Sequence, residues 1–263
     1  MNRIRTGVPL TEDSPLRKVS HDLRVEVGSK ICTKVLERFR NDVLAVLIIG
    51  STAKSLDQPF SDLEMDIIVK DTLEVPTKFY LYNGLLVQID YKQESSFLSE
   101  VGKITQEWPL WADECRNRIV LFERDGWTRK LAKAVEQNDK ADFSEGIRFS
   151  ALGMTESLAA VRNADIKDDM IDLRTRAFYM AWDTAKLVYM LNRKNVLTTS
   201  WFWKQLFECP EQPTEFRKLI DIVAGFVPST RKGLVEASEM LWKETMLLVK
   251  RRNISIESSD ILV

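Results

Sequence analysis

The spacing of apolar residues changes near Trp127 and divides the chain into two parts. Before this point, short apolar runs separated by turn residues predict strands. After it, apolar residues recur with helical spacing, and glycine and proline become sparse. We therefore expect an α+β fold, in which residues 1–127 form an α/β domain with a mixed sheet and residues 128–263 form an all-α helical bundle.

One helix and four or five strands are expected in the first part. Apolar residues about every four positions predict a helix from Pro15 to about Arg40. The nearly continuous apolar run at residues 43–49 is typical of a strand buried on both faces. Asn83-Gly84 separates two further runs and predicts a two-residue hairpin turn. The other expected strands are residues 62–69, 78–82, 85–91 and 118–122.

Helices are expected throughout the second part. Their predicted ranges are residues 128–137, 143–163, 170–192, 201–208, 213–226 and 230–252. The tryptophans of this part, among them Trp182, Trp201 and Trp203, are expected to pack in the core or in a dimer interface rather than to stack on a ligand.

Composition narrows the possible functions. The formal net charge of −1 gives no reason to expect nucleic acid as a partner. The three cysteines lack metal-site spacing and are expected to be reduced thiols, and the single histidine, His21, is expected on the helix surface. No apolar stretch approaches the ~20 residues of a membrane span, and the N-terminus lacks the apolar run of a signal peptide. We therefore expect a cytoplasmic protein without membrane contact.

The strongest chemical signal is the stretch LIIGSTAKSLDQPFSDLEMDIIVK at residues 47–70. Gly50 lets the backbone turn tightly and approach a ligand, and the hydroxyl of Ser51 can donate to a phosphate oxygen. Residues two apart in a strand share a face, so Asp62 and Glu64 are expected to point the same way. Mg²⁺ uses few carboxylates together with phosphate and water, so this pattern suits a metal that holds a polyphosphate. The pattern predicts nucleotidyl transfer.

Two further charged residues extend the candidate site, and a third lies beside it in the sequence. Lys54 is expected to place a cation near the phosphates. Asp90 lies in the next apolar run and is expected as a third metal ligand, because an unpaired carboxylate there would be costly to bury, unless it lies in water at the strand end. Asp66 shares the face of Asp62 and Glu64. It can either support the metal ligands from behind or point past the site to solvent, and we expect the second.

These residues resemble the nucleotidyltransferase superfamily, whose mark is Gly-Ser, a spacer and then Asp-x-Asp/Glu. Within it, the chain resembles the kanamycin nucleotidyltransferase group. GSTAKSLDQPFSDLEM at residues 50–65 looks like that group's Gly-Ser…Pro-aromatic-Ser-Asp-Ile-Glu-Met segment, with equal spacing. EWPL at residues 107–110, FERDGW at 122–127 and ESLAAVRN at 156–163 support the resemblance, which spans most of the chain.

The resemblance implies a polymerase-β-like domain followed by a helical domain. It implies magnesium-dependent transfer of AMP from ATP to an aminoglycoside, at a kanamycin-type 4′-hydroxyl, with release of pyrophosphate. It assigns Gly50 and Ser51 to the phosphate turn and Asp62 and Glu64 to the metal. It also assigns Glu156 to the general base that activates the acceptor hydroxyl. Finally, it implies a homodimer in which both subunits build each active site.

Two departures from the group's pattern change the expected site. The group has a glutamate at the position of Gln88 and a neutral residue at that of Asp90, so the third acid is expected to have moved two places along one strand face. The group's phosphate-contacting lysine is replaced by Ala160, and Arg162 or Lys54 is expected to substitute for it.

Several alternatives stay open at the level of sequence. The acceptor can instead be a lincosamide, another metabolite or a protein side chain. Acidic residues at 94–107 and 113–114 are either binding groups for ammonium ions or ordinary surface charges. A non-catalytic, antitoxin-like binding module would be expected to lose its paired acids, which this chain retains. A polymerase would need a basic groove, which the neutral charge balance does not favour.

Overall fold

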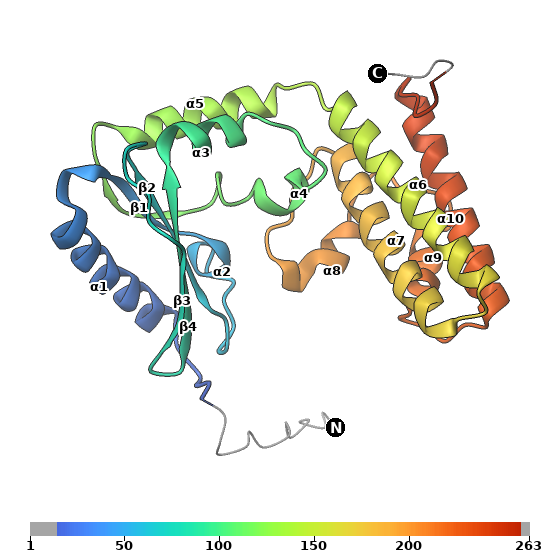
Figure 1. Cartoon of the computed structure of the whole chain (residues 1–263), viewed down its shortest axis with the longest axis horizontal. Helices are drawn as coiled ribbons and strands as arrows, with labels where there is room; N and C mark the ends of the chain where they lie inside the picture. Colours follow the sequence, from blue (N-terminus) through green and yellow to red (C-terminus); the bar gives the residue numbers. More distant parts are fainter. Residues whose placement is uncertain (1–14, 259–263) are drawn as a thin grey trace. The chain divides into compact units, whose positions relative to one another are not determined.

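The computed structural model describes residues 15–258, and all structural statements below concern these residues. Figure 1 traces the chain through them, and they form two compact units. Unit 1 comprises the described residues up to Leu98 together with Asn117–Leu131. Unit 2 comprises Ser99–Arg116 together with the described residues from Ala132 onward. Ser99–Arg116 thus packs with unit 2 although it lies within the range 1–127, and the domain boundary at residue 127 stays a prediction.

Unit 1 contains a five-stranded sheet with strand order β3-β4-β2-β1-β5. Strands β2 and β4 run parallel, and the other neighbouring pairs are antiparallel. The strands are β1 (Val43–Ile48), β2 (Leu63–Val69), β3 (Lys78–Tyr82), β4 (Leu85–Gln93) and β5 (Ile119–Glu123). The expected mixed sheet is confirmed, and every residue of β1 is buried, as its apolar run predicted.

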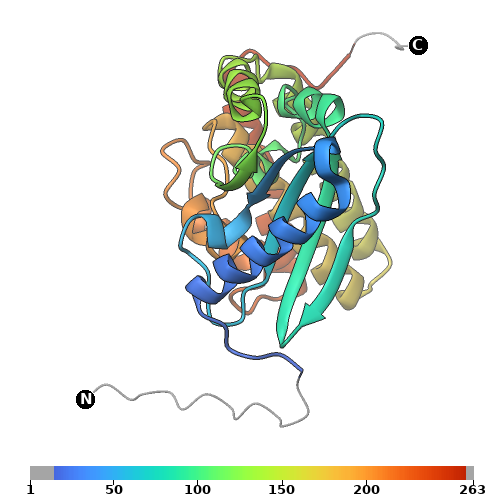
Figure 2. The same cartoon turned by 90° about the vertical axis from the view of Figure 1, so that its left-hand side faces the viewer.

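Helix α1 (His21–Phe39) covers one face of this sheet (Figure 2). It begins after Ser20, whose side chain accepts a hydrogen bond from the backbone N–H of Leu23. Val27 of α1 lies in one apolar cluster with Met65 and the other odd-numbered residues of β2. Because side chains alternate along a strand, the even-numbered residues of β2 face the other side of the sheet. That side carries the candidate site.

The segment before α1 is extended, so the expectation of a helix from residue 15 is wrong at its start. The backbone N–H of Arg17 donates to the carbonyl oxygen of Gly84, and that of Val19 donates to the carbonyl oxygen of Pro59. These bonds attach the segment to the hairpin turn and to the loop before β2. In a helix from residue 15 the N–H of Val19 would bond within the helix, but here it is bonded to Pro59, and the helix begins only beyond this residue.

The hairpin of β3 and β4 has the turn that its sequence predicted. Asn83 has φ 50° and Gly84 has φ 84°, and a type I′ turn requires positive φ at both central residues. Strand β3 lies at the edge of the sheet, and all of its residues are exposed.

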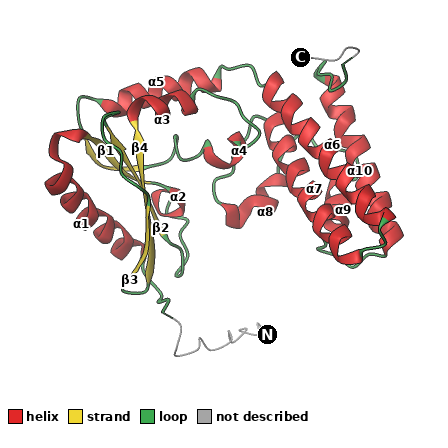
Figure 3. Cartoon of the chain, in the orientation of Figure 1, coloured by secondary structure: helices red, strands yellow, loops and turns green. Residues whose placement is uncertain are grey.

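Unit 2 is helical, and none of the described strands belongs to it (Figure 3). Its long helices are α6 (Ser144–Ile166), α7 (Met170–Leu191) and α10 (Arg231–Arg251), which share apolar clusters. Trp182 stacks on Phe202 with ring centroids 4.0 Å apart, and Trp203 packs against the same cluster, which confirms the expected core role for these two tryptophans.

The remaining helical segments are short. They are η1 (Arg40–Asp42), α2 (Gly50–Ala53), α3 (Glu94–Val101), α4 (Trp108–Trp111), α5 (Trp127–Asp139), η2 (Thr199–Trp201), α8 (Phe202–Leu206) and α9 (Phe216–Val223). Helices α3 and α4 were not expected from the sequence.

Candidate active site

A glycine and a glutamate meet where β1 passes into α2. Gly50 has φ +66°, a conformation that residues with side chains rarely adopt. The backbone N–H of Ile49 donates to the carbonyl oxygen of Glu64 at 3.0 Å, which holds the end of β1 beside the start of β2. A β-carbon added at Gly50 would lie 1.8 Å from Oε2 of Glu64. The carboxylate of Glu64 therefore occupies the space that a side chain at residue 50 would fill.

Asp62 lies on the same side of the sheet as Glu64. It directly precedes β2, and both carboxylates are half-buried. Leu63 and Met65 alternate with them and are buried in the core that faces α1. This alternation is that of extended backbone, which places Asp62 and Glu64 together on the opposite face. The structure thus brings the two predicted carboxylates to one face, with Glu64 directly at the Gly50 turn.

Ser51 and Lys54 belong to the same turn as Gly50. The carbonyl oxygen of Ser51 accepts hydrogen bonds from the backbone N–H groups of Lys54, at 3.2 Å, and Leu56, at 3.0 Å. These bonds close the turn immediately after Gly50, and the side chain of Ser51 is half-buried there. Contact of Ser51 and Lys54 with phosphate stays a prediction.

Arg24 of α1 holds the loop that leads to Asp62, and the sequence analysis did not single it out. Its Nε and Nη2 atoms donate to the carbonyl oxygen of Ser61 at 3.0 and 2.9 Å, and Nη2 also donates to that of Gln58 at 2.7 Å. Nη1 donates to Oδ2 of Asp57 at 2.8 Å. The sequence did contain a signal for this role, because Arg24 lies within the apolar stripe of the predicted helix. A guanidinium buried there needs several hydrogen-bond acceptors from other segments.

Asp57 is the charged partner of this arginine. The side chains of Asp57 and Arg24 are 3% and 1% exposed, so they form a buried ion pair. Oδ1 of Asp57 also contacts Nδ1 of His21 at 2.9 Å. The expectation of His21 as an ordinary surface residue is therefore incomplete, since its ring binds the loop before β2. The loop between the Gly50 turn and Asp62 is held by α1 through these side chains.

Asp66 differs from its expectation. It is fully buried, and its carboxylate lies 3.0 Å from Nζ of Lys92 on β4. The expectation that it points to solvent is wrong, because β2 is an inner strand whose pairing places Asp66 between Leu47 of β1 and Asp90 of β4. Lys92 lies two residues beyond Asp90 on the same strand face, so it can supply the counter-charge that a buried carboxylate needs.

Asp90 of β4 does not lie directly opposite Glu64 of β2 but two residues further along the same face of the sheet. In the parallel register Gln88 pairs with Glu64, whereas Asp90 pairs with Asp66. Oδ1 of Asp90 accepts from Oγ1 of Thr77 at 2.7 Å, and Oδ2 accepts from Nε2 of Gln88 at 2.8 Å. Within residues 15–258, no group of three or more His, Cys, Asp or Glu side chains is arranged to hold a metal ion. A metal-binding role for Asp90 stays a prediction, which this register does not favour.

Glu156 and Arg162, the two predicted residues of the second part, lie on α6 in unit 2. Both are exposed. Nε and Nη2 of Arg162 bind the two carboxylate oxygens of Glu239 at 2.6 and 2.7 Å. This hydrogen-bonded pair raises the pKa of Arg162 and lowers that of Glu239. The roles of Glu156 as base and of Arg162 as phosphate ligand stay predictions.

Two acids that were candidates for binding ammonium ions already have cationic partners. Glu94 lies 2.7 Å from Nζ of Lys130, and Glu107 lies 2.6 Å from Nζ of Lys186. Burial lowers the pKa of Lys186, but Glu107 and Asp183 more than offset this effect, so the pKa of Lys186 is raised. Glu94 and Glu107 therefore form ion pairs within the protein.

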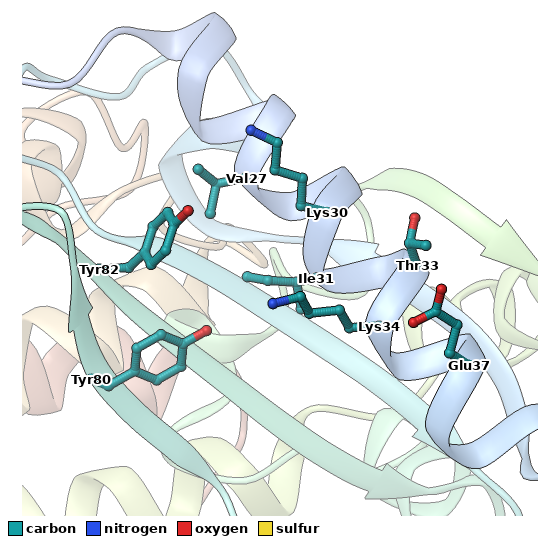
Figure 4. A pocket seen from close by; sticks show the side chains of 8 residues that line it. All are labelled: Val27, Lys30, Ile31, Thr33, Lys34, Glu37, Tyr80 and Tyr82. Carbon is teal, nitrogen blue, oxygen red and sulfur yellow. The ribbon is translucent and has the colours of Figure 1, made fainter.

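A cavity of about 470 Å³ lies between α1 and β3, lined by Tyr80, Tyr82 and Lys30 among others (Figure 4). Tyr80 pairs with Val87 and Tyr82 pairs with Leu85, and these two partners belong to the apolar core under α1. In-register residues of neighbouring strands share a face, so this cavity and the carboxylates lie on opposite faces of the sheet. The cavity is therefore not part of the candidate active site.

Comparisons with known proteins identify relatives of both parts. Residues 125–255 match the family model described as KNTase C-terminal domain. Aminoglycoside nucleotidyltransferases (4′) from Staphylococcus aureus and from Bacillus sp are each 19% identical over 243 residues, which cover 92% of this chain and 96% of the relative. A crystal structure of a nucleotidyltransferase-like protein from Exiguobacterium sibiricum 255-15 is 15% identical, covers 85% of this chain and 75% of that chain, and has a TM-score of 0.49. In residues 15–258, no helix is long and apolar enough to cross a membrane.

Proposed function

Because the chain is a nucleotidyltransferase enzyme, we propose that it transfers AMP from ATP to a hydroxyl of a small acceptor and releases pyrophosphate. The proposed acceptor is an aminoglycoside with a kanamycin-type 4′-hydroxyl, in line with the names of the two relatives. The observation that carries the proposal is the carboxylate of Glu64 packed against the bare α-carbon of Gly50. It supports a site in which a phosphate turn and a metal-binding acid are in direct contact.

Mg²⁺ is the proposed cofactor, and the residues at the turn fit it. Asp62 and Glu64 offer two carboxylates on one face, and Mg²⁺ in nucleotide sites is typically bound by one or two carboxylates plus phosphate and water. When bound, the metal supplies charge stabilisation at the reacting phosphate. Gly50 leaves the backbone open to the phosphates, and Ser51 donates its hydroxyl to a phosphate oxygen. Lys54 adds a positive charge in the same turn.

Glu156 is the proposed general base. It would accept the proton of the acceptor hydroxyl, which is a weak nucleophile until that proton has somewhere to go. Its carboxylate is exposed on α6, so it is accessible to a bound acceptor. Arg162, on the same helix, is the proposed contact to the nucleotide phosphates, and it would have to release Glu239 to make that contact. The protein is also proposed to form a homodimer and to act in the cytoplasm.

Substitution of Asp62 tests the proposed reaction. We expect purified protein with Mg²⁺, ATP and kanamycin to release pyrophosphate, and we expect Asp62→Asn to reduce this rate by about 10³-fold or more, because metal stabilisation of phosphoryl transfer is worth several kcal/mol. Coupled detection of pyrophosphate measures the rate. Asp22→Asn, at an exposed aspartate in the first turn of α1, is the matched control and should keep the wild-type rate.

Testing several acceptors separates the proposed reaction, which is adenylyl transfer, from the proposed acceptor, which is an aminoglycoside. Turnover of lincosamides but of no aminoglycoside would overturn the aminoglycoside acceptor and keep adenylyl transfer. Equal rates for Asp62→Asn and wild type would contradict the assignment of the site itself.

Mixing inactive subunits tests where Glu156 acts. Glu156→Gln should lower the rate by about 10²-fold or more, which is the usual contribution of a general base. If each site takes its base from the other subunit, a mixture of Glu156→Gln and Asp62→Asn proteins should regain part of the wild-type rate, because mixed dimers then contain one intact site. Glu145→Gln, at an exposed position of the same helix, is the control and should stay active. Mixed dimers that form without any recovery would place the base in its own subunit.

A further inference from the structure

The residue of β4 that lies opposite Glu64 is an amide rather than an acid. Gln88 is the register partner of Glu64, and in-register residues of parallel neighbours share a sheet face. Asp90 lies two residues further along β4, about 7 Å by the rise of a strand. Gln88 is therefore the side chain of β4 that is best placed to contact an ion held by Asp62 and Glu64.

The hydrogen bonds of Asp90 determine which end of the Gln88 amide is turned away from it. Nε2 of Gln88 donates to Oδ2 of Asp90 at 2.8 Å, so the nitrogen end of the amide faces Asp90. The hydroxyl of Thr77 occupies the other carboxylate oxygen of Asp90 at 2.7 Å. Oε1 of Gln88 is thus left on the side away from Asp90, and it accepts no hydrogen bond from the described residues.

We infer that Oε1 of Gln88 is the third protein oxygen of the divalent-cation site, and that Asp90 is a positioning residue that orients it. This inference rests on the proposed function, because it concerns the metal of the same site. It fits the absence, within residues 15–258, of three His, Cys, Asp or Glu side chains arranged to hold a metal ion, although Asp62 and Glu64 share one face of the sheet. Amide oxygens are ordinary ligands of hard cations such as Mg²⁺ and Mn²⁺.

The neutral ligand has a consequence for metal affinity. Asp62, Glu64 and Gln88 together bring two negative charges instead of three, and affinity for hard cations rises with the number of charged ligands. The free protein should hold the metal weakly, and the phosphates of the nucleotide should supply the missing charge. Metal and nucleotide should therefore bind with positive coupling.

Mn²⁺ binding to the full-length protein tests this without any turnover. Electron paramagnetic resonance reports free Mn²⁺, and titration gives the Kd for each variant. Gln88→Glu should tighten binding by about tenfold, because it adds a third carboxylate at the position opposite Glu64. Gln88→Leu should weaken it by about tenfold or more, as expected for loss of a metal-site partner. Gln93→Leu, at the end of the same strand, is the matched control and should leave Kd unchanged.

A double-mutant cycle separates orientation by Asp90 from direct binding. Asp90→Leu should raise the Kd about tenfold in the wild-type background, as loss of an orienting partner usually does, and should have no further effect in Gln88→Leu. Asp90→Asn should keep most of the affinity, because its amide oxygen can still accept from Nε2 of Gln88. Unfolding curves for each variant show whether the sheet is retained.

Opposite results would overturn the inference. If Asp90 is itself the ligand, Asp90→Asn raises the Kd strongly and Gln88→Leu leaves it unchanged. Failure of both wild type and Gln88→Glu to bind Mn²⁺ would also reject it. The proposed function can fail independently of this inference. If the Kd values follow the predicted order but no acceptor is adenylylated, the metal site is retained and the proposed function is rejected. If an acceptor is adenylylated but the Kd values identify Asp90 as the ligand, the proposed function is retained and the role of Gln88 is rejected.

Discussion

Gly50→Ala is expected to abolish nucleotidyl transfer, with a loss on the order of 10³-fold, comparable to loss of the proposed metal-binding acid itself. The added β-carbon would lie 1.8 Å from Oε2 of Glu64, so the carboxylate must leave the turn. Alanine also adopts the φ of +66° at residue 50 only with strain. Pyrophosphate release and Mn²⁺ affinity should fall together, because the variant displaces Glu64, a proposed metal ligand.

Gly225→Ala is the matched control for this variant. Gly225 has φ +75°, but a β-carbon there has nothing within 4 Å, so only the backbone strain is reproduced. This variant should lose roughly 1–2 kcal/mol of unfolding free energy and keep its activity. In addition, Gly50→Ala in a Glu64→Ala background should cost no more stability than Gly225→Ala, because the clashing carboxylate is gone. Full activity of Gly50→Ala would contradict the contact on which the site depends.

Arg24→Met is expected to lower the free energy of unfolding by about 3–5 kcal/mol, the usual cost of removing one partner of a buried ion pair. Asp57, at 3% exposure, would keep only His21 as a side-chain partner. The carbonyl oxygens of Gln58 and Ser61 would lose the hydrogen bonds that Arg24 donates, although that of Gln58 would still accept from the backbone N–H of Ser61, so the loop before Asp62 would be held less firmly. Urea unfolding followed by circular dichroism measures the stability, and activity should fall as well because Asp62 is no longer held in place.

A second substitution separates two effects of losing Arg24, namely the unpaired charge of Asp57 and the missing hydrogen bonds to the loop. Arg24→Met with Asp57→Leu removes both charges and should recover part of the lost stability. It should not recover activity, because the loop still lacks the hydrogen bonds that Arg24 donates. Arg38→Met, at an exposed arginine of the same helix, is the control and should change stability by no more than about 0.5 kcal/mol. Wild-type stability and activity of Arg24→Met would contradict a role for Arg24 in holding the loop.

Local patterns predicted most of the elements and the centre of the candidate site. The apolar run that became β1, the Asn83-Gly84 hairpin and the turn at Gly50 each depend on residues close together in sequence. The alternation around Glu64 likewise follows from a single strand. These features are encoded by side-chain chemistry and backbone freedom over a few residues, so they can be inferred without knowing what packs against them.

Other features depend on segments that are distant in sequence. Whether Asp90 or Gln88 lies opposite Glu64 is a matter of register between β2 and β4, and a shift of two residues leaves each strand's own pattern unchanged. The burial of Asp66 follows from the inner place of β2 in the sheet.

The sequence by itself determined a mixed sheet followed by helices and a glycine turn that precedes two carboxylates on one strand face, because periodicity and glycine's conformational freedom act over short range. Only the tertiary structure decided that Glu64 fills the space beside Gly50, that Arg24 holds the loop to Asp62 and that Gln88 lies opposite Glu64. Each of these is a contact between segments far apart in the chain, and such contacts are chosen by the packing and hydrogen bonding of the whole fold.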